Sequence, residues 1–465
     1  MKAFPAVAVF LLVVAAVGAG ATAAQPASTD PPQAPSSATQ PGASGASAAL
    51  PGTALRDSEA GSDTAVAGDA GANESRAQTT ANVSNGPNVS RILALRTTDA
   101  STIDVVTIDA GTATAFGTNA STARLRTLAI RERIQRANTS EARREIILDA
   151  MNEVEADTDA MSARQQRALE AYVDGDITGK ELLVRLARIR AQSAALADRI
   201  RMLSDAAEAT EDFSLGDADI YPLLYDLRTF DGPVRDAVAA ALRGETAETR
   251  VYVAANRTGV VLTTIAGGDY VRETYRGDLR NRDGSDVNLT VVREVVAESY
   301  PEIWAAAPDS EKTGEGSIGT KLYQVQYAGG SLTAYVDGGT ERIFREQQRI
   351  ALDSFPSGPT RSRTLDLTVR VNRTYAGGPL RIAVVDPATG DPVNAVVKIG
   401  REGGESTTIG RTGDDGVLWT LSPRGTYVVT AVDTSSTDVG VISVSPTDPA
   451  TVAEAYNGTR AESSG

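Results

Sequence analysis

The sequence predicts a multidomain protein with a disordered N-terminal tether, a long antiparallel α-helical hairpin, an α+β module and a C-terminal β-sandwich. Three observations support this fold class. A low-complexity stretch follows an apolar N-terminus, and two consecutive segments carry apolar residues at alternating three- and four-residue spacing. The C-terminal region alternates apolar and polar residues between turn signals. With 465 residues, the chain has room for about three domains.

The N-terminus has the features of an export signal. Lys2 precedes a run of apolar and small residues from Ala3 to Ala24, and Ala21-Thr22-Ala23 matches a cleavage site. Residues 1–24 are therefore expected to be a signal peptide, with an uncleaved signal anchor as the alternative. Residues 25–88 consist mostly of Ala, Gly, Ser, Thr and Pro, so they bury too little apolar surface to fold and form a disordered linker.

Residues 89–212 are expected to hold short strands at 92–95 and 103–108, a helix near 125–138, and the hairpin. Thr178 and Glu181 form a capping box at the start of the second arm of the hairpin. The predicted apolar seam of the first arm consists of Ile147, Met151, Val154, Thr158, Met161, Gln165, Ala168 and Tyr172. That of the second arm consists of Leu182, Leu186, Ile189, Ser193, Leu196, Ile200, Leu203 and Ala207.

Residues 213–352 are predicted to form an α+β module. Helices are expected at 219–227, 233–242 and 291–304, strands at 251–253, 260–265, 270–275, 322–327 and 332–336, and a Gly-rich loop at 313–319. The final helix and hairpin are similar to small PepSY-type or cystatin-like modules, which implies binding or shielding of a partner. An apolar groove near Tyr270, Tyr275, Trp304 and Tyr327 would favour that role.

Residues 362–446 read as a β-sandwich, and residues 447–465 as a disordered tail. The expected strands cover 365–371, 380–385, 394–399, 406–411, 416–421, 426–432 and 439–444. Gly416 serves a tight turn, and Tyr427 is expected to pack inward. The segments 385–397, 412–417 and 423–429 resemble, in order, the signatures of carboxypeptidase-regulatory-like (transthyretin-like) domains. That resemblance implies an accessory sandwich without catalysis of its own.

Composition excludes several kinds of chemistry. The chain has no cysteine and no histidine, which rules out disulfides, thiolate or imidazole metal sites and histidine-dependent triads. A net charge of −15 argues against nucleic-acid binding. Only five of the 45 basic residues are lysine, which indicates adaptation to concentrated salt, or alternatively a genome rich in arginine codons. Together with the domain order, these features resemble uncharacterised secreted and cell-surface proteins of halophilic archaea.

Asparagine is scarce, yet nine of the 13 asparagines begin an N-x-S/T sequon. Such enrichment is typical of an exported chain with surface glycans. The candidate glycosylation sites are Asn73, Asn82, Asn88, Asn119, Asn138, Asn256, Asn288, Asn372 and Asn457.

One turn has part of the ligand spacing of a calcium site. Asp174, Asp176 and Thr178 occupy positions 1, 3 and 5 of an EF-hand-like loop, but Arg185 stands at position 12, where Ca²⁺ needs a bidentate Glu. We therefore favour a polar helix–helix turn and expect no metal or cofactor. The carboxylate-rich loops 281–286 and 414–416 are likewise interpreted as tight turns.

These features predict a non-enzymatic, exported, glycosylated cell-surface protein with a structural or interaction role. Its expected partners are an envelope protein or a glycan, with no nucleic acid, and with membrane contact only through an uncleaved N-terminal segment. The sequence leaves the oligomeric state open. One alternative is a ligand- or peptide-binding regulatory module that partners a membrane protein. The other is a carboxylate-dependent glycan hydrolase, for which the 60 acidic residues nominate no pair.

Overall fold

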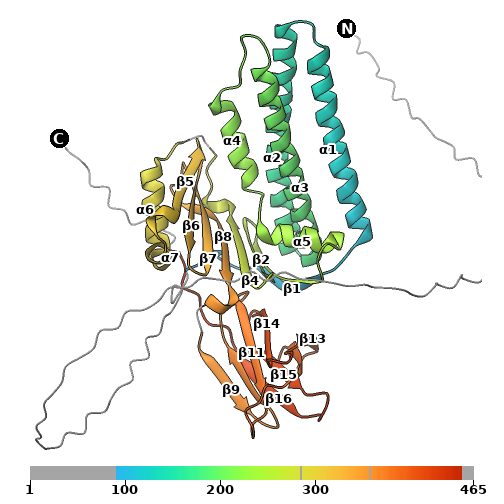
Figure 1. Ribbon diagram of the computed structural model, residues 1–465, viewed down its shortest axis with the longest axis vertical. Helices are drawn as coiled ribbons and strands as arrows, with labels where there is room; N and C mark the ends of the chain where they lie inside the picture. The colour runs from blue at the N-terminus through green and yellow to red at the C-terminus, as the bar shows by residue number, and fades with distance from the viewer. Residues whose placement is uncertain (1–90, 283–284, 356–357, 453–465) are drawn as a thin grey trace, which may run out of the picture. The chain divides into compact units, whose positions relative to one another are not determined.

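A computed structural model describes residues 91–282, 285–355 and 358–452, all within one compact unit, Thr79–Gly465. Its central feature is an eight-stranded antiparallel sheet in the order β1-β2-β3-β4-β8-β7-β6-β5 (Figure 1). The predicted signal peptide, linker and C-terminal tail lie outside the described residues, apart from residues 447–452. The strands of the sheet are β1 (Ala100–Val106), β2 (Thr249–Asn256), β3 (Gly259–Ala266), β4 (Asp269–Arg276), β5 (Lys312–Ser317), β6 (Thr320–Tyr327), β7 (Gly330–Asp337) and β8 (Ile343–Ala351).

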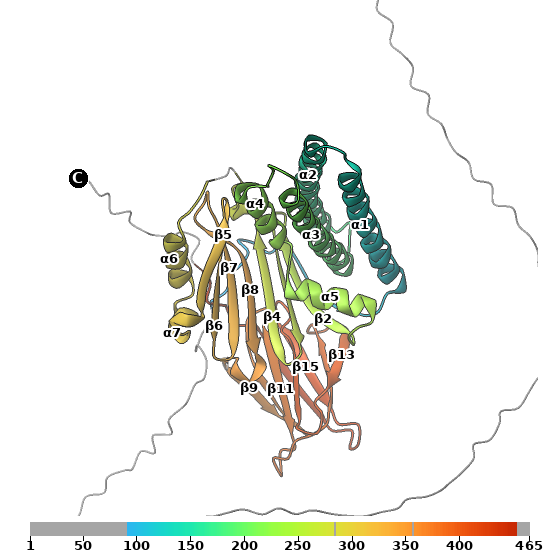
Figure 2. The same ribbon diagram turned by 45° about the horizontal axis from the view of Figure 1, so that its top comes forward.

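Five helices lie on one face of this sheet. Of these, α1, α2 and α3 run side by side (Figures 1 and 2). All sixteen residues predicted to form the seams of α2 and α3 are buried, because a three-four spacing places them on one side of each helix. The capping box of Thr178 and Glu181 is also present. The five helices are α1 (Ala110–Arg136), α2 (Ser140–Val173), α3 (Gly179–Glu208), α4 (Asp217–Arg228) and α5 (Pro233–Arg243).

Helix α1 differs from its prediction. It begins at Ala110, well before residue 125, because the Asp109 side chain accepts a hydrogen bond from the Thr112 amide and caps it. Two residues expected on its apolar side, Leu125 and Leu128, are 66% and 48% exposed. The helix instead packs through its other apolar residues, including Ile130 and Ile134.

The sheet joins residues 89–212 and residues 213–352, which the sequence predicts to be separate regions. Strand β1 pairs with β2, with Thr102 opposite Val253, although about 150 residues lie between them. The backbone amide and carbonyl groups of a lone strand lack hydrogen-bond partners within the sheet, so β1 needs β2 as a neighbour. The helical region and the α+β region therefore share one sheet and one core.

The opposite face of the sheet carries two shorter helices, α6 (Leu289–Ser299) and α7 (Pro301–Ala306), beside β5 and β6 (Figure 1). One helix was predicted here, but Pro301 lacks an amide proton and begins a new helix after Tyr300. Strand β5 occupies the expected Gly-rich loop, and β8 was not predicted at all. The remaining helical turns are η1 (Gly277–Leu279), η2 (Asp309–Glu311) and η3 (Leu352–Ser354).

The C-terminal region forms the predicted β-sandwich, with two four-stranded sheets ordered β14-β11-β10-β9 and β13-β12-β15-β16. Tyr427 points into its core at 2% exposure, and Gly416 adopts φ +67°, a conformation that favours glycine. Strand β9 makes eight strands where seven were expected. They are β9 (Thr360–Thr364), β10 (Thr368–Asn372), β11 (Pro379–Val385), β12 (Val396–Gly400), β13 (Ser406–Arg411), β14 (Val417–Leu421), β15 (Tyr427–Val432) and β16 (Val439–Val444).

The sandwich contacts the face of the large sheet opposite α5. The carbonyl oxygen of Gly377 accepts hydrogen bonds from Thr263 Oγ1 at 2.6 Å and from the Tyr270 hydroxyl at 3.1 Å. Gly377 has φ +79°, and a Cβ there would lie 2.4 Å from Tyr252 Cδ1. This close approach requires glycine, so the contact is sterically specific.

Candidate functional site

The two central strands of the sheet carry the same dipeptide, Arg-Glu, at Arg272-Glu273 in β4 and at Arg345-Glu346 in β8. Their antiparallel register pairs Arg272 with Gln348 and Glu273 with Gln347. Since side chains alternate along a strand, Arg272 and Glu346 share one face, while Glu273 and Arg345 share the other. Each arginine therefore reaches the glutamate of the opposite strand.

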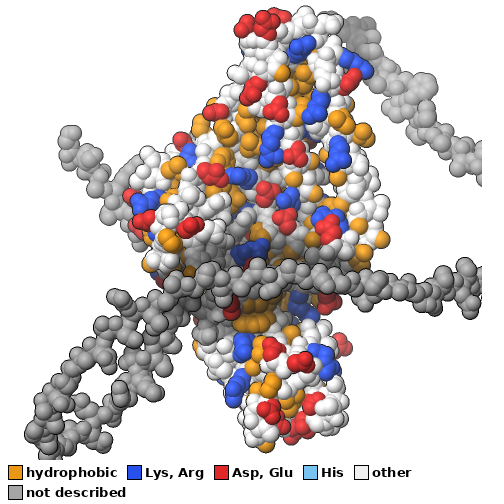
Figure 3. Space-filling model, in the orientation of Figure 1, with side chains coloured by type: hydrophobic (Ala, Val, Ile, Leu, Met, Phe, Trp, Pro, Cys, Tyr) orange, Lys and Arg blue, Asp and Glu red, His pale blue; other side chains and the backbone are white. Residues whose placement is uncertain are grey.

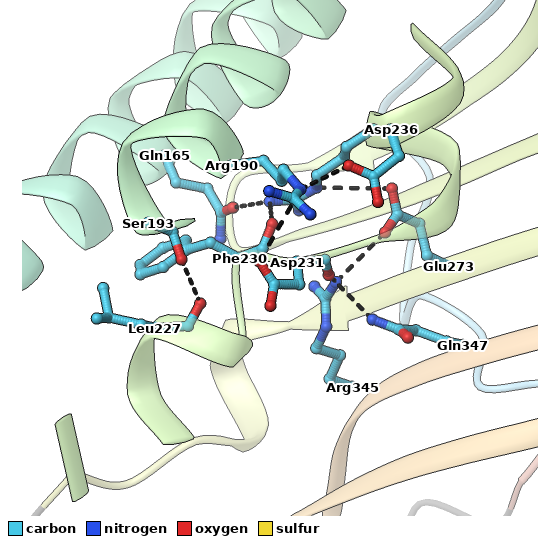
Figure 4. A network of polar contacts seen from close by, with 11 residues as sticks. Gln165, Arg190, Ser193, Leu227, Phe230, Asp231, Asp236, Glu273, Arg345 and Gln347 are labelled. Atoms are coloured by element: carbon cyan, nitrogen blue, oxygen red, sulfur yellow. Dashed lines mark hydrogen bonds and ion pairs between the residues drawn. The ribbon is translucent and has the colours of Figure 1, made fainter. Parts of the chain in front are cut away.

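On the helical face, Glu273 lies between two arginines. Its Oε1 is 3.5 Å from Arg235 Nε in α5, and its Oε2 is 3.3 Å from Arg345 Nη2 (Figure 4). All three side chains are at most 2% exposed. Arg235 also donates to Gln165 Oε1 in α2 at 3.0 Å and to the Phe230 carbonyl at 3.1 Å. The network thereby joins helices α2 and α5 to the centre of the sheet.

Gly232 creates the space for this carboxylate. A Cβ at this position would lie 1.5 Å from Glu273 Oε2. Burial raises the pKa of Glu273, against the opposing effect of Arg235 and Arg345. Burial also lowers the pKa of Arg235, to about 10. Arg235 hence stays charged at neutral pH, and the Glu273 carboxylate between the two arginines is compensated.

Above this network, a groove of about 390 Å³ lies between α3 and α4. Arg190, Asp231 and Ser193 line its floor. Ser193 Oγ donates to the Leu227 carbonyl at 2.7 Å, which links α3 to α4. The Asp231 carbonyl accepts from Gln347 Nε2 at 2.9 Å and also from Arg345, so the groove floor is held by the buried network (Figure 4).

The groove contains both signs of charge, and two of its carboxylates are paired. Arg201 Nη1 is 2.6 Å from Asp198 Oδ1, and Arg228 Nη1 is 2.6 Å from Glu315 Oε1. Arg190 Nε is 2.5 Å from Asp236 Oδ1 and 4.0 Å from Asp231 Oδ1, so Asp231 is only loosely paired. Burial raises the pKa of Asp231 despite the nearby arginines. Such a surface offers donors, acceptors and two tyrosine rings, Tyr221 and Tyr225, to a polar ligand.

On the other face, the pair of Arg272 and Glu346 holds the first described segment of the chain. Arg272 Nε is 3.1 Å from Glu346 Oε1, and Arg272 Nη2 donates to the Leu93 carbonyl at 2.8 Å. Glu346 Oε2 accepts from the Leu93 amide at 2.6 Å and from the Tyr300 hydroxyl at 2.7 Å. Arg276 Nη1 donates to the Ala94 carbonyl at 2.7 Å.

Residues 91–95 also pair with the C-terminal end of the described chain. Ile92 forms a parallel bridge with Thr451. The Ile92 amide donates to the Ala450 carbonyl at 3.0 Å, and the Val452 amide donates to the Ile92 carbonyl at 3.0 Å. We call residues 91–95, with the side chains of Arg272, Glu346 and Arg276 that bind them, the N-terminal clamp.

The proposed metal-site candidates have other roles in the structure. Asp174 pairs with Arg257, and Thr178 Oγ1 accepts from the Glu181 amide at 3.2 Å, as a helix cap does. Asp176 is an exposed residue of the same turn. In the part of the chain that the structure describes, no group of three or more acidic side chains is placed to hold a metal ion.

The nine sequons fall into distinct environments. Asn119, Asn138 and Asn288 are exposed, and Asn372 is partly buried. Asn256 is only 7% exposed, and its Nδ2 donates to the Thr97 carbonyl at 3.2 Å. This nitrogen would carry the glycan, so the structure makes Asn256 a poor acceptor. Asn73, Asn82, Asn88 and Asn457 lie outside the described residues.

The aromatic residues considered for a groove do not form one. Tyr270 and Tyr327 are buried on the face opposite the helical layer, whereas Tyr275 packs against the core on the helical face. Trp304 packs on Tyr323, with ring centroids 5.5 Å apart.

The groove between α3 and α4 was missed because its residues come from separate helices and a strand. The repeated Arg-Glu dipeptide was the one available signal for the network beneath it.

These features define a multidomain α+β protein with a buried ionic network and a C-terminal sandwich. The chain belongs to the family described as "Domain of unknown function (DUF7096)", whose model matches residues 1–247. A second model, "Family of unknown function (DUF7094)", matches residues 251–356, and an "Archaeal fibronectin-III type-like domain" matches residues 360–440. The sandwich is thus similar to an archaeal fibronectin-III type-like domain, and no family model matches it to the carboxypeptidase-regulatory-like domains that its sequence resembles.

Comparison with curated proteins gives no match. Among solved structures, the chain is similar to the crystal structure of a beta-1,2-glucanase from Parabacteroides distasonis. The identity is 12%, the TM-score is 0.13, and the match covers 40% of this chain and 32% of the glucanase. The match therefore spans about a third of the enzyme, and a TM-score this low supports no argument about fold or activity.

Proposed function

We propose that this chain is a non-catalytic, exported surface protein that binds a partner through the groove between α3 and α4. The observation that carries the proposal is the pairing of charges in this groove. Asp198 and Glu315 each pair with an arginine at 2.6 Å, and Asp231 lies 4.0 Å from Arg190, which also pairs with Asp236. A hydrolase would need two carboxylates free to act on the substrate, whereas a binding surface needs a rigid pattern of both signs.

Rigidity supports the binding role. The groove floor at Asp231 is fixed by Arg345 and Gln347 of the central strand, so little order has to be gained on binding. Red and blue side chains alternate over the helical layer (Figure 3), a distribution that gives specificity through charge complementarity.

Export and glycosylation are proposed from the sequence. The apolar run from Ala3 to Ala24 with its cleavage signature supports export, and exposed sequons at Asn119, Asn138 and Asn288 support surface glycans. Acidic net charge with arginine in place of lysine supports a halophilic setting. Among the helices that the structure describes, none is long and apolar enough to cross a membrane.

The N-terminal clamp supports a tethered arrangement. The segment that directly follows residue 90 is held at the sheet centre by buried charged groups of Arg272 and Glu346. Hydrogen bonds to charged groups in a dry environment are the strong ones. Tension along the N-terminal segment would therefore act on the most buried part of the sheet rather than on an edge.

Site-specific photo-crosslinking on intact cells tests the binding role. A photo-reactive residue replaces Tyr221, which lines the groove and is 46% exposed. The matched control replaces Leu289, which is 40% exposed on α6, on the opposite face of the sheet. We expect a discrete cross-linked product at the cell surface from position 221 only. Equal products from both positions, or none from position 221, would contradict the proposal.

Asp231 favours a second candidate, a carboxylate-dependent glycan hydrolase. Its raised pKa would suit a general acid, with Glu315 in the same groove as the second carboxylate. Release of reducing sugar from envelope glycans, abolished in both Asp231→Asn and Glu315→Gln, would establish this candidate. The binding proposal predicts no release by the unmodified chain.

A further inference from the structure

A second hollow, separate from the groove, lies among α1, α2 and α3 and has a volume of about 200 Å³. Its charged lining consists of Arg126 from α1, Asp157 and Arg164 from α2, and Arg199 from α3. We call it the Arg199 pocket.

Arg199 is the most unusual of these side chains. It is 2% exposed, and its Nε and Nη1 have no hydrogen-bond partner. Its nearest anionic partner is Asp157, whose Oδ2 lies 3.8 Å from Arg199 Nη1, beyond hydrogen-bond distance. The same oxygen is 3.6 Å from Arg126 Nη1, so two guanidinium groups share one carboxylate.

The charge around the pocket is not balanced. Glu153 is the other acidic residue that acts on Arg199, while Arg126 opposes it. Asp157 and Glu153 together leave one of the three arginine charges uncompensated. Burial lowers the pKa of Arg199, as expected for a cation that has lost water without gaining full pairing. A buried donor without an acceptor is costly, so an acceptor is expected at this position.

We propose that the Arg199 pocket binds a small hydroxylated molecule through a single carboxylate. One negative charge neutralises the excess, and a carboxylate oxygen supplies the missing acceptor for the Arg199 guanidinium. Thr122 and Gln192 also line the pocket and offer hydrogen bonds to hydroxyl groups, while Leu196 gives it an apolar side. A dianion fits less well, because Asp157 would repel its second charge.

Ligand-dependent thermal stability tests this site. The full chain is produced in a host that adds no glycan to Asn119, and the chloride concentration is kept constant. D-glucuronate is the probe, glucose is its neutral counterpart, and sulfate is the dianion. We expect a saturable rise in melting temperature with glucuronate, no rise with glucose, and a smaller one with sulfate.

Variants show whether Arg199 is responsible. Arg199→Met keeps the side-chain volume and removes the charge, so it should fold and lose the response to glucuronate. Arg126→Met should weaken binding of glucuronate about tenfold. Because the Arg126 side chain is 63% exposed, this variant should fold even if Arg199→Met does not, so the test stays valid. Arg136→Met alters an exposed arginine of the same helix α1 and should leave the response unchanged.

Several results would overturn the proposal. These are no response to glucuronate, an undiminished response in Arg199→Met or Arg126→Met, or an equal response to sulfate. The groove between α3 and α4 takes no part in these measurements, so their outcome is independent of the proposed function.

Discussion

At the scale of single residues, the buried charges depend on close steric fits. Glu273 occupies a space that exists only because residue 232 has no side chain. Glu346 has acceptor sites for Arg272, Tyr300 and the Leu93 amide. Burial raises the pKa of both glutamates, so each depends on its partners to remain ionised at neutral pH.

Replacing Gly232 with alanine tests the first of these fits. The new Cβ would lie 1.5 Å from Glu273 Oε2, so the carboxylate must move away from Arg235 and Arg345. We expect the free energy of unfolding to fall by about 2–4 kcal/mol, as when a buried ion pair is broken. Denaturant unfolding measures the change.

Gly117 provides the control for that substitution. It lies in α1 with nothing within 4 Å of its Cβ position. Alanine there should leave stability unchanged or raise it by up to about 1 kcal/mol. Equal effects at both positions would show that the space beside Glu273 is not specific.

At the scale of elements, local pattern explains which parts of the fold could be predicted. The α2 and α3 seams follow from spacing along one helix, so Ile147 and Leu182 could be placed in the core from sequence alone. Strand β8 could not, because residues 345–349 are all polar or charged. The burial of Arg345 and Glu346 depends on partners in β4, which lies far away in the chain. The groove and the Arg199 pocket were missed for the same reason.

The pairing of β4 with β8 gives a prediction at this scale. Arg272→Met leaves Glu346 buried without its cation and should reduce the free energy of unfolding by about 3–5 kcal/mol. The double variant Arg272→Met with Glu346→Met removes both charges and should recover only part of that loss, because the Leu93 amide and the Tyr300 hydroxyl lose their acceptor. Denaturant unfolding of both single variants and the double variant measures the coupling.

An exposed pair serves as the reference for this cycle. Arg136 and Glu132 lie in α1 with side chains 79% and 52% exposed. Removing either one should change the free energy of unfolding by less than about 1 kcal/mol. If the double variant at Arg272 and Glu346 loses the sum of its single losses, the two charges are not coupled.

At the scale of the whole molecule, one sheet unites residues 100–106 with residues 249–351. The helical layer packs on one of its faces, and α6, α7 and the sandwich pack on the other. The family models divide the same region near residue 250, at the start of β2. This boundary falls within the shared core, so we expect the segments on its two sides to fold together.

Buried tyrosines make stability depend on alkaline pH. Burial raises the pKa of Tyr427 to about 12, whereas an unfolded tyrosine titrates near about 10. The folded state therefore holds this proton more tightly, and its stabilising effect is complete below pH ~10 and lost as the pH rises to ~12. Tyr172 in α2 should behave in the same way, with its pKa also raised to about 12.

Comparing the wild type with Tyr427→Phe isolates this effect from the titration of the other buried groups. The advantage of the wild type in unfolding free energy should shrink by about 2–3 kcal/mol between pH ~10 and pH ~12. Denaturant unfolding at several pH values, with absorbance at ~295 nm to follow tyrosinate, measures it. A constant difference over that range would contradict the raised pKa.

Mass spectrometry of the native protein, recovered by cell fraction, tests the central proposal most directly. We predict a chain in the surface or medium fraction that lacks residues 1–24, carries glycan on Asn119, Asn138 or Asn288, and leaves Asn256 unmodified. A surface-bound chain that keeps residues 1–24 would support the signal-anchor alternative. An unprocessed chain without glycan, confined to the cytoplasm, would contradict the account.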